Sequence, residues 1–250
     1  MDRIWHATIP VDALSVDDRE EMLQLMETYY LGVTREQFNR DLDEKDRVIM
    51  LRQDSSRGRV AGFSTLMCLD VDVGGEPVKV VFSGDTIVDR RSRGTLGLGL
   101  ECAKYFVQLV AEHPGCDLFY VLTAKGWQTC RIPGLLFRQY SPSPGQPMIC
   151  RHQQVMDAFG ARKYPGRYQP TTGLITYSGE AQRLRPGSPE GSIPPRDNPL
   201  VDLFVEKNPN YLQGDDLVYV AQIADWNFTG AFKKLLTSLK EPGKEPGLVG

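Results

Sequence analysis

Apolar residues in the first 140 positions follow two periods, and each period predicts one kind of element. Apolar residues at helical spacing predict helices that begin near Ser15 and Thr34, each of which can cap a first turn. Runs of β-branched and other apolar residues predict strands over 4–9, 48–52, 60–73, 78–88 and 117–122. Helices and strands that alternate in this way indicate a mixed α/β (α+β) domain.

The stretch 80–112 joins a strand, a tight turn and a helix. The strand ends at Val88, a turn rich in glycine and arginine covers 89–97, and apolar residues at helical spacing continue to Glu112. Because another strand follows at 117–122, the unit should be a right-handed crossover between parallel strands. Gly74 and Gly75 predict a hairpin between the strands over 60–73 and 78–88. The strands before the crossover are therefore expected to be antiparallel.

The turn is suited to binding a phosphate group. Glycine lets backbone N–H groups approach an anion without a Cβ in the way, and the first turn of a helix leaves N–H groups unpaired. Arg90, Arg91 and Arg93 add positive charge beside those amides. An ordinary glycine-containing connection with solvated arginines explains the same residues, and this alternative stays open.

The strand end and turn together resemble the GNAT superfamily of acyl-CoA N-acyltransferases, in which a strand ends in Arg/Gln-x-x-Gly-x-Gly/Ala before a long helix. The resemblance covers roughly residues 17–140, and the segment from Arg93 to Gly99 is one residue longer than the family pattern. It implies acyl-CoA as cosubstrate, its pyrophosphate held by the loop amides and its pantetheine arm by the end of the strand. The residues implied in this binding are Ile87, Val88, Arg91, Arg93, Gly94, Thr95, Leu96, Gly97, Leu98 and Gly99.

An amine acceptor must lose a proton before it attacks a thioester, which calls for a general base. Asp85 is an acid among apolar residues of the strand over 78–88, and the resemblance implies that an acid on this strand is the base. Alternatively, Asp85 pairs with a neighbour or orders a kink at Gly84, where glycine permits a β-bulge. The resemblance also implies the Val88 amide as oxyanion donor. Tyr120 and Tyr140 are the candidates for a general acid.

The remainder of the chain fits the family pattern poorly. The sequence predicts a short helix over 125–131, ended by Pro133 and Gly134, and then a strand over 135–140. A helix over 148–159, a strand over 173–177 and a proline-rich loop over 185–199 are expected next, before a last strand over 217–223 and a helix over 228–239. We therefore expect a core over 1–140, an inserted substrate-covering segment over 141–216, and the final core strand and helix over 217–250.

Composition limits the partners. The formal net charge of −3 offers no general attraction to nucleic acid, and no apolar run approaches the length of a membrane span. Five cysteines without paired spacing favour a reduced, cytoplasmic protein. No metal site is predicted, since Cys150 and His152 form the nearest ligand pair and an ordinary buried thiol explains Cys150 better.

The sequence thus predicts an enzyme that moves an acyl group from an acyl-CoA or acyl carrier protein thioester to an amine. The additional residues over 141–216 favour a medium or long acyl chain and an acceptor presented on a peptide or complex metabolite; alternatively, they cover the sheet or form a homodimer contact. A noncatalytic GNAT-like module that binds an acyl thioester or a protein is the second hypothesis. The altered loop supports it, as do Trp127, Gln128 and Thr129, where the family often has Tyr or Asn.

Overall fold

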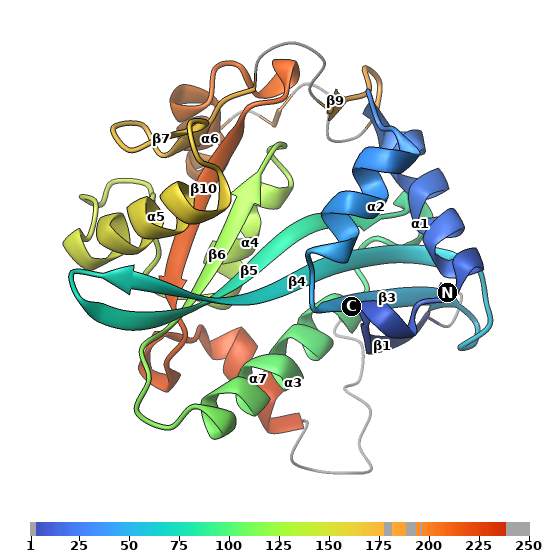
Figure 1. Cartoon of the computed structure of the whole chain (residues 1–250), viewed down its shortest axis with the longest axis horizontal. Coiled ribbons are helices and arrows are strands. Elements are labelled where there is room, and N and C mark those ends of the chain that lie inside the picture. Colours follow the sequence, from blue (N-terminus) through green and yellow to red (C-terminus); the bar gives the residue numbers. More distant parts are fainter. Residues whose placement is uncertain (1–3, 178–181, 189–193, 196, 239–250) are drawn as a thin grey trace.

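The computed structural model describes residues 4–177, 182–188, 194–195 and 197–238, and one twisted sheet forms its centre (Figure 1). This sheet has eight strands in the order β1-β3-β4-β5-β6-β10-β8-β7. Two short strands, β2 and β9, form a separate pair. The strands are β1 (Ile4–Pro10), β2 (Tyr30–Leu31), β3 (Arg47–Gln53), β4 (Val60–Val73), β5 (Glu76–Val88), β6 (Leu118–Ala124), β7 (Tyr168–Gln169), β8 (Leu174–Ile175), β9 (Arg183–Leu184) and β10 (Asp216–Gln222).

Neighbouring strands of the large sheet run antiparallel except β5 and β6, which run parallel. Helix α3 (Gly97–Glu112) connects this parallel pair, as the strand, turn and helix pattern predicts. A hairpin at Gly74 and Gly75 joins β4 to β5, and both glycines adopt the left-handed conformation that the turn requires. The predicted mixed, mostly antiparallel sheet flanked by helices is therefore confirmed.

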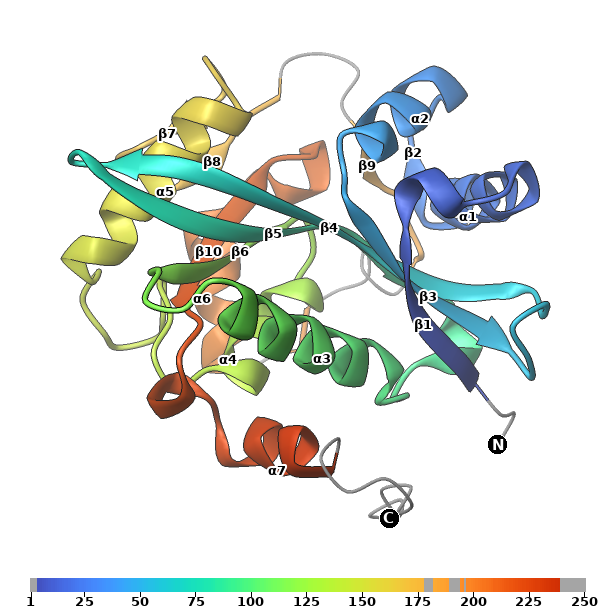
Figure 2. The ribbon, with the colours of Figure 1, turned by 60° about the horizontal axis from the view of Figure 1, so that its bottom comes forward.

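Helices cover both faces of the sheet (Figure 2). One face carries α1 (Val16–Tyr29), α2 (Arg35–Asp43) and α5 (Cys150–Lys163), and the other carries α3, α4 (Ile132–Leu136) and α7 (Gly230–Ser238). Helix α6 (Pro199–Lys207) packs against the short turn over 129–131. A buried apolar cluster lies between each helical layer and the sheet. The covering helices contribute Phe106 of α3, Phe159 of α5 and Met26 of α1 to these clusters.

Helix caps on the α1–α2 face follow from the sequence. Ser15 and Asp18 form a reciprocal capping box at the start of α1. Thr34 accepts a hydrogen bond from the Gln37 amide at the start of α2. Each cap satisfies a first-turn N–H group that the helix itself leaves unpaired, which is why these helices begin where the sequence predicts.

The predicted elements are wrong between residues 131 and 140. Pro133 lies in the first turn of α4 instead of ending a helix, because proline lacks the N–H that a first turn leaves unpaired anyway. The strand expected over 135–140 does not form: Leu136 ends α4, and Phe137 makes an isolated bridge to Phe228. The loop expected over 185–199 lies partly outside the described residues.

The inserted segment covers part of the sheet. Helix α5 packs on β4 and β10, where Val155, Met156 and Phe159 are fully buried. Covering the sheet is one of the alternatives that the sequence leaves open for this segment, and the packing of α5 is consistent with it.

In the described ranges, no helix is both long enough and apolar enough to cross a membrane.

Candidate active site

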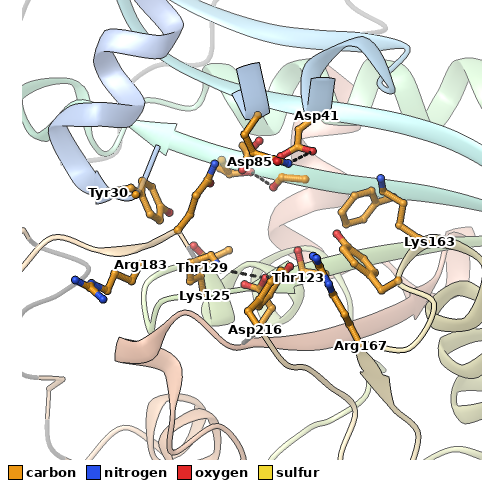
Figure 3. Close-up of a pocket in the computed structure, with 18 of the residues that line it drawn as sticks. Tyr30, Asp41, Asp85, Thr123, Lys125, Thr129, Lys163, Arg167, Arg183 and Asp216 are labelled. Carbon is orange, nitrogen blue, oxygen red and sulfur yellow. Dashed lines mark hydrogen bonds and ion pairs between the residues drawn. The ribbon is translucent and has the colours of Figure 1, made fainter. Parts of the chain in front are cut away.

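The two parallel strands separate beyond their last paired residues, and a cavity opens there. Pairing between β5 and β6 ends at Ser83 opposite Leu122, after which β5 continues to Val88. The cavity has a volume of about 520 Å³ and lies between the α1–α2 connection, the end of α5 and the separated strands (Figure 3). Its lining is mostly polar: Tyr30, Gly32, Thr34, Gln37, Asp41, Lys45, Phe82, Gly84, Asp85, Thr86, Thr123, Lys125, Thr129, Lys163, Tyr164, Arg167, Tyr177, Gln182, Arg183 and Asp216.

A β-bulge in β5 shapes the floor of the cavity. Thr86 pairs with Ser64 and Ser83 pairs with Leu66, so Gly84 and Asp85 together face the single residue Thr65 of β4. Gly84 is required at this bulge, since a Cβ there would lie 2.7 Å from the Thr65 Oγ1 atom. The bulge that Gly84 permits is therefore present, and it sets Asp85 out of the regular alternation of the strand.

Asp85 lies within the cavity in a strongly desolvated position. Burial raises the pKa of the Asp85 carboxyl above its ordinary value, the positive charges of Lys45 and Lys125 oppose that rise, and Asp41 and Asp216 add to it. Across the described ranges, its carboxylate makes no hydrogen bond, and this leaves both oxygens available to a ligand. A carboxyl with a raised pKa is a stronger base than an ordinary aspartate, which suits Asp85 to accept a proton.

Lys45 approaches Asp85 from the end of α2. Its Nζ atom donates to the backbone oxygen of Asp41 at 2.7 Å and lies 5.8 Å from the centre of the Phe82 ring. Burial lowers the pKa of Lys45, whereas the charge of Asp85 raises it. Of the positive charges that act on Asp85, that of Lys45 has the larger effect on the carboxyl, ahead of Lys125.

Tyr164 is a site residue that the sequence prediction missed. It caps the end of α5, and its ring packs edge-on against Phe82, with ring centres 6.3 Å apart. Burial raises its pKa well above the ordinary value, and the charges of Asp216 and Asp85 raise it further. The hydroxyl thus stays protonated and can donate a hydrogen bond to a ligand, although its raised pKa makes it a weaker acid than an ordinary tyrosine. Only the packing of α5 on the sheet brings Tyr164 here, and no local pattern in the sequence signals it.

The predicted general acids lie elsewhere. The Tyr120 ring packs in the core beneath α3, 5.6 Å from the centres of the Phe106 and Phe137 rings. The Tyr140 hydroxyl points toward α4, where a Cβ on Gly134 would lie 3.1 Å from it. Neither tyrosine lines the cavity.

The turn between β5 and α3 contains one glycine in the left-handed conformation and leads into the first turn of the helix. Gly94 adopts a φ of 86°, and a Cβ there would meet no atom within 4 Å. Helix α3 begins at Gly97 without a side-chain cap from Leu96, and the Gly97 amide donates to Thr95 Oγ1 at 3.3 Å. The next amides of the first turn, those of Leu98 and Gly99, are available to an external anion.

Arg93 turns back toward the separated strands. Its side chain donates to the Val88 oxygen at 3.3 Å and to Gln128 Oε1 at 2.9 Å, and it lies 5.8 Å from the centre of the Tyr29 ring. Arg91, in contrast, is exposed. Arg93 therefore connects the end of β5 with the segment that follows β6.

The two glycines at the start of α3 also have a packing role. A Cβ on Gly97 would lie 2.8 Å from Leu51 and 3.1 Å from His6, whereas one on Gly99 would lie 3.5 Å from Leu235. Gly97 thus allows α3 to approach β1 and β3 closely. Ile87, Val88 and the loop residues up to Gly99 lie beyond the last paired residues of β5 and β6.

No group of three or more histidine, cysteine, aspartate or glutamate residues is arranged to hold a metal ion in the part of the chain that the structure describes. No protein-family model matches the chain, and no curated protein matches it either.

Three solved structures share part of the fold. A protein of Enterococcus faecalis described as a probable N-acyltransferase is 14% identical over 55% of this chain and 34% of its own, with a TM-score of 0.39. A GNAT family N-acetyltransferase of Escherichia coli, in complex with CoA, is 17% identical over 54% of this chain and 64% of its own, with a TM-score of 0.34. An acetyltransferase of Trypanosoma brucei is 15% identical over 58% of this chain and 100% of its own, with a TM-score of 0.40.

The chain therefore spans 34% of the first of these proteins and 64% of the second. All three are described as acyl- or acetyltransferases, and the resemblance of this chain to the GNAT superfamily stays a prediction. Fold and site together define a mixed α/β protein with a charged cavity where two parallel strands separate. Matches this partial leave the activity to be inferred from the site residues.

Proposed function

We propose that the chain is an N-acyltransferase that moves an acyl group from an acyl-CoA thioester to an amine bound in the cavity. The observation that carries this proposal is Asp85, a desolvated carboxyl with a raised pKa, placed by a β-bulge at the opening between two parallel strands. An uncapped helix N-terminus and its glycine-containing loop begin just beyond the same strand.

The proposed binding follows from this arrangement. The amides over 94–99 face the pyrophosphate, and Arg91 and Arg93 add positive charge. The pantetheine arm runs along Ile87 and Val88 into the opening between β5 and β6, which brings the thioester carbon to the cavity. The Val88 amide is the proposed donor to the oxyanion.

The proposed reaction needs one base and one acid. Asp85 accepts a proton from the amine nitrogen, which forms a bond to the thioester carbon. The carbon–sulfur bond then breaks, the leaving thiolate takes a proton from the Tyr164 hydroxyl, and the proton that Asp85 accepted from the amine restores that hydroxyl. Because Tyr120 and Tyr140 lie outside the cavity, Tyr164 replaces them as the proposed acid.

Acyl length is a separate question. The lining of the cavity is mostly polar and charged, which suits a polar acceptor better than a hydrocarbon chain. The expected preference for medium or long acyl groups stays a prediction, as does an acyl carrier protein as donor.

Substitution of Asp85 tests the proposal. Asp85→Asn should lower turnover by roughly 10² or more with any amine that is a substrate, while calorimetry shows unchanged coenzyme A binding. Asp70→Asn is the matched control, because Asp70 is exposed on β4 and pairs with Lys79 at 2.7 Å. Full activity of Asp85→Asn would refute its role as base.

The second hypothesis is a noncatalytic module that binds an acyl thioester. It predicts coenzyme A binding by the unmodified protein together with no release of free thiol across a broad panel of amines. The one-residue extension of the loop is the observation in its favour.

A further inference from the structure

Basic side chains outnumber acidic ones around the cavity. Lys45, Lys125, Lys163, Arg167 and Arg183 line it, against Asp41, Asp85 and Asp216. An amine acceptor is itself positive before it loses its proton, so the acids can be understood as its partners. The excess of positive charge needs a different explanation.

Two of these five cations form ion pairs within the protein. Lys125 donates to Asp216 at 3.1 Å and to the Gly214 oxygen at 2.6 Å. Lys163 forms an ion pair with Glu44. These contacts neutralise the two lysines, and they leave Asp216 and Glu44 engaged.

The two arginines that line the cavity, Arg167 and Arg183, form no ion pair with any residue in the described ranges. Arg167 is set apart by its ring contact: it follows α5, and its guanidinium carbon lies 5.3 Å from the centre of the Tyr177 ring. The Lys125 Nζ atom lies 4.7 Å from the same ring, and the Tyr177 hydroxyl donates to Asp216 at 3.1 Å. Two cations thus converge on one aromatic ring. Lys125 and Tyr177 already occupy the Asp216 carboxylate, and the Asp215 carboxylate accepts from the Tyr177 backbone amide at 3.0 Å.

The position of Arg167 relative to Asp85 matters for the substrate. Figure 3 shows Arg167 reaching into the cavity from the wall that follows α5, across from Asp85 on β5. A molecule that spans the cavity meets a base at one wall and a guanidinium at the other. A guanidinium presents a planar fork of donors that matches a carboxylate or a phosphate.

We propose that the amine acceptor carries an anionic group, a carboxylate or a phosphate, which Arg167 binds while the amine faces Asp85. This inference rests on the proposed function and specifies its acceptor. A cavity of about 520 Å³ is the size of a small-molecule site, so the acceptor is a free small molecule such as an amino acid or an amino sugar phosphate.

Matched pairs of amines test the inference. One pair is an amino acid and its amide, and the other is an amino sugar phosphate and the unphosphorylated amino sugar. Within a pair, the anionic member should be preferred by about tenfold or more in kcat/KM, as expected when charge-assisted hydrogen bonds are lost. The pair that shows the larger preference distinguishes carboxylate from phosphate.

Arg167→Gln should remove this preference by lowering kcat/KM for the anionic member toward that of its neutral counterpart. Arg162→Gln is the matched control, since Arg162 is exposed in the last turn of α5 and does not line the cavity. This control should keep the full preference.

Calorimetry with the same pairs separates the two proposals. If Arg167→Gln binds the anionic amine about tenfold more weakly than the wild type does, the inference is supported even when no amine is turned over. A lack of turnover with every amine would refute the acyltransferase activity alone. Equal binding and equal use of both members of each pair overturn the inference and leave the activity standing. An equal effect of Arg167→Gln on charged and neutral amines also overturns it.

Discussion

Substitution of Glu101 tests which contacts fix α3, the helix that follows the glycine-containing loop, against the sheet. Its carboxylate is buried on α3, and three side chains contact it: His6 at 2.9 Å and Thr8 at 3.0 Å from β1, and Lys104 at 2.5 Å from its own helix. These contacts tie α3 to the edge strand β1. We therefore expect Glu101→Gln to destabilise the fold in a way that depends on pH.

The magnitude follows from the carboxyl's protonation. Burial alone would raise the pKa of Glu101, but hydrogen bonds from His6, Lys104 and Thr8 outweigh burial and lower it from 4.5 to about 2. Since a pKa difference of one corresponds to about 1.4 kcal/mol, the ionised carboxylate contributes about 3 kcal/mol to the free energy of unfolding at pH 6. A lowered native pKa means that this contribution is present above pH 4.5 and is lost as the pH falls toward 2.

Chemical denaturation of the wild type and of Glu101→Gln at two pH values measures the effect. Linkage predicts a difference in unfolding free energy of about 3 kcal/mol at pH 6 and about 2 kcal/mol at pH 3.5. Glu112→Gln is the control, because Glu112 is exposed at the end of the same helix and should change stability by less than about 0.5 kcal/mol at either pH. A difference for Glu101→Gln that stays constant with pH would refute the electrostatic reasoning.

The remaining predictions concern the acid, the packing of α5 and the acyl group. Tyr164→Phe keeps the ring contact with Phe82 but removes the proton donor, so turnover should fall at least about tenfold. Tyr120→Phe and Tyr140→Phe should stay active in the same turnover assay. The reverse pattern would indicate that one of the two core tyrosines is the acid. Gly160→Ala should lower stability by about 1–3 kcal/mol, since the new Cβ would lie 2.2 Å from the Tyr168 ring; an unchanged melting temperature would show that α5 can shift. Turnover across acyl-CoA chains from acetyl to palmitoyl tests the expected preference for longer groups, and a flat profile or a preference for acetyl contradicts it.

The sequence predicted the half of the site that local signals encode. Strand, glycine turn and helix follow one another over residues 80–112, so the position of Asp85, the bulge at Gly84 and the loop up to Gly99 could all be read from neighbouring residues. The pattern failed at Pro133, where a residue that ends helices in one context begins a helix in another.

The other half of the cavity depends on long-range packing. Lys163, Tyr164 and Arg167 lie about 80 residues from Asp85 in sequence, and they reach the cavity because α5 docks on β4 and β10. Apolar spacing predicts that α5 is a helix, yet it carries no information about where the polar residues at its end will lie. Those residues became visible as site residues only with the fold.

The additional residue in β5 also changes the phase of the strand. Phe82 and Ile87 stand five positions apart, an odd number, and strict alternation would send them to opposite faces of the sheet. Yet Phe82 packs beneath α5 and Ile87 beneath α1, on the same face. The additional residue thus lets β5 direct Phe82 toward α5 and Ile87 toward α1 on the same face of the sheet. Asp85 lies at the bulge between these two positions.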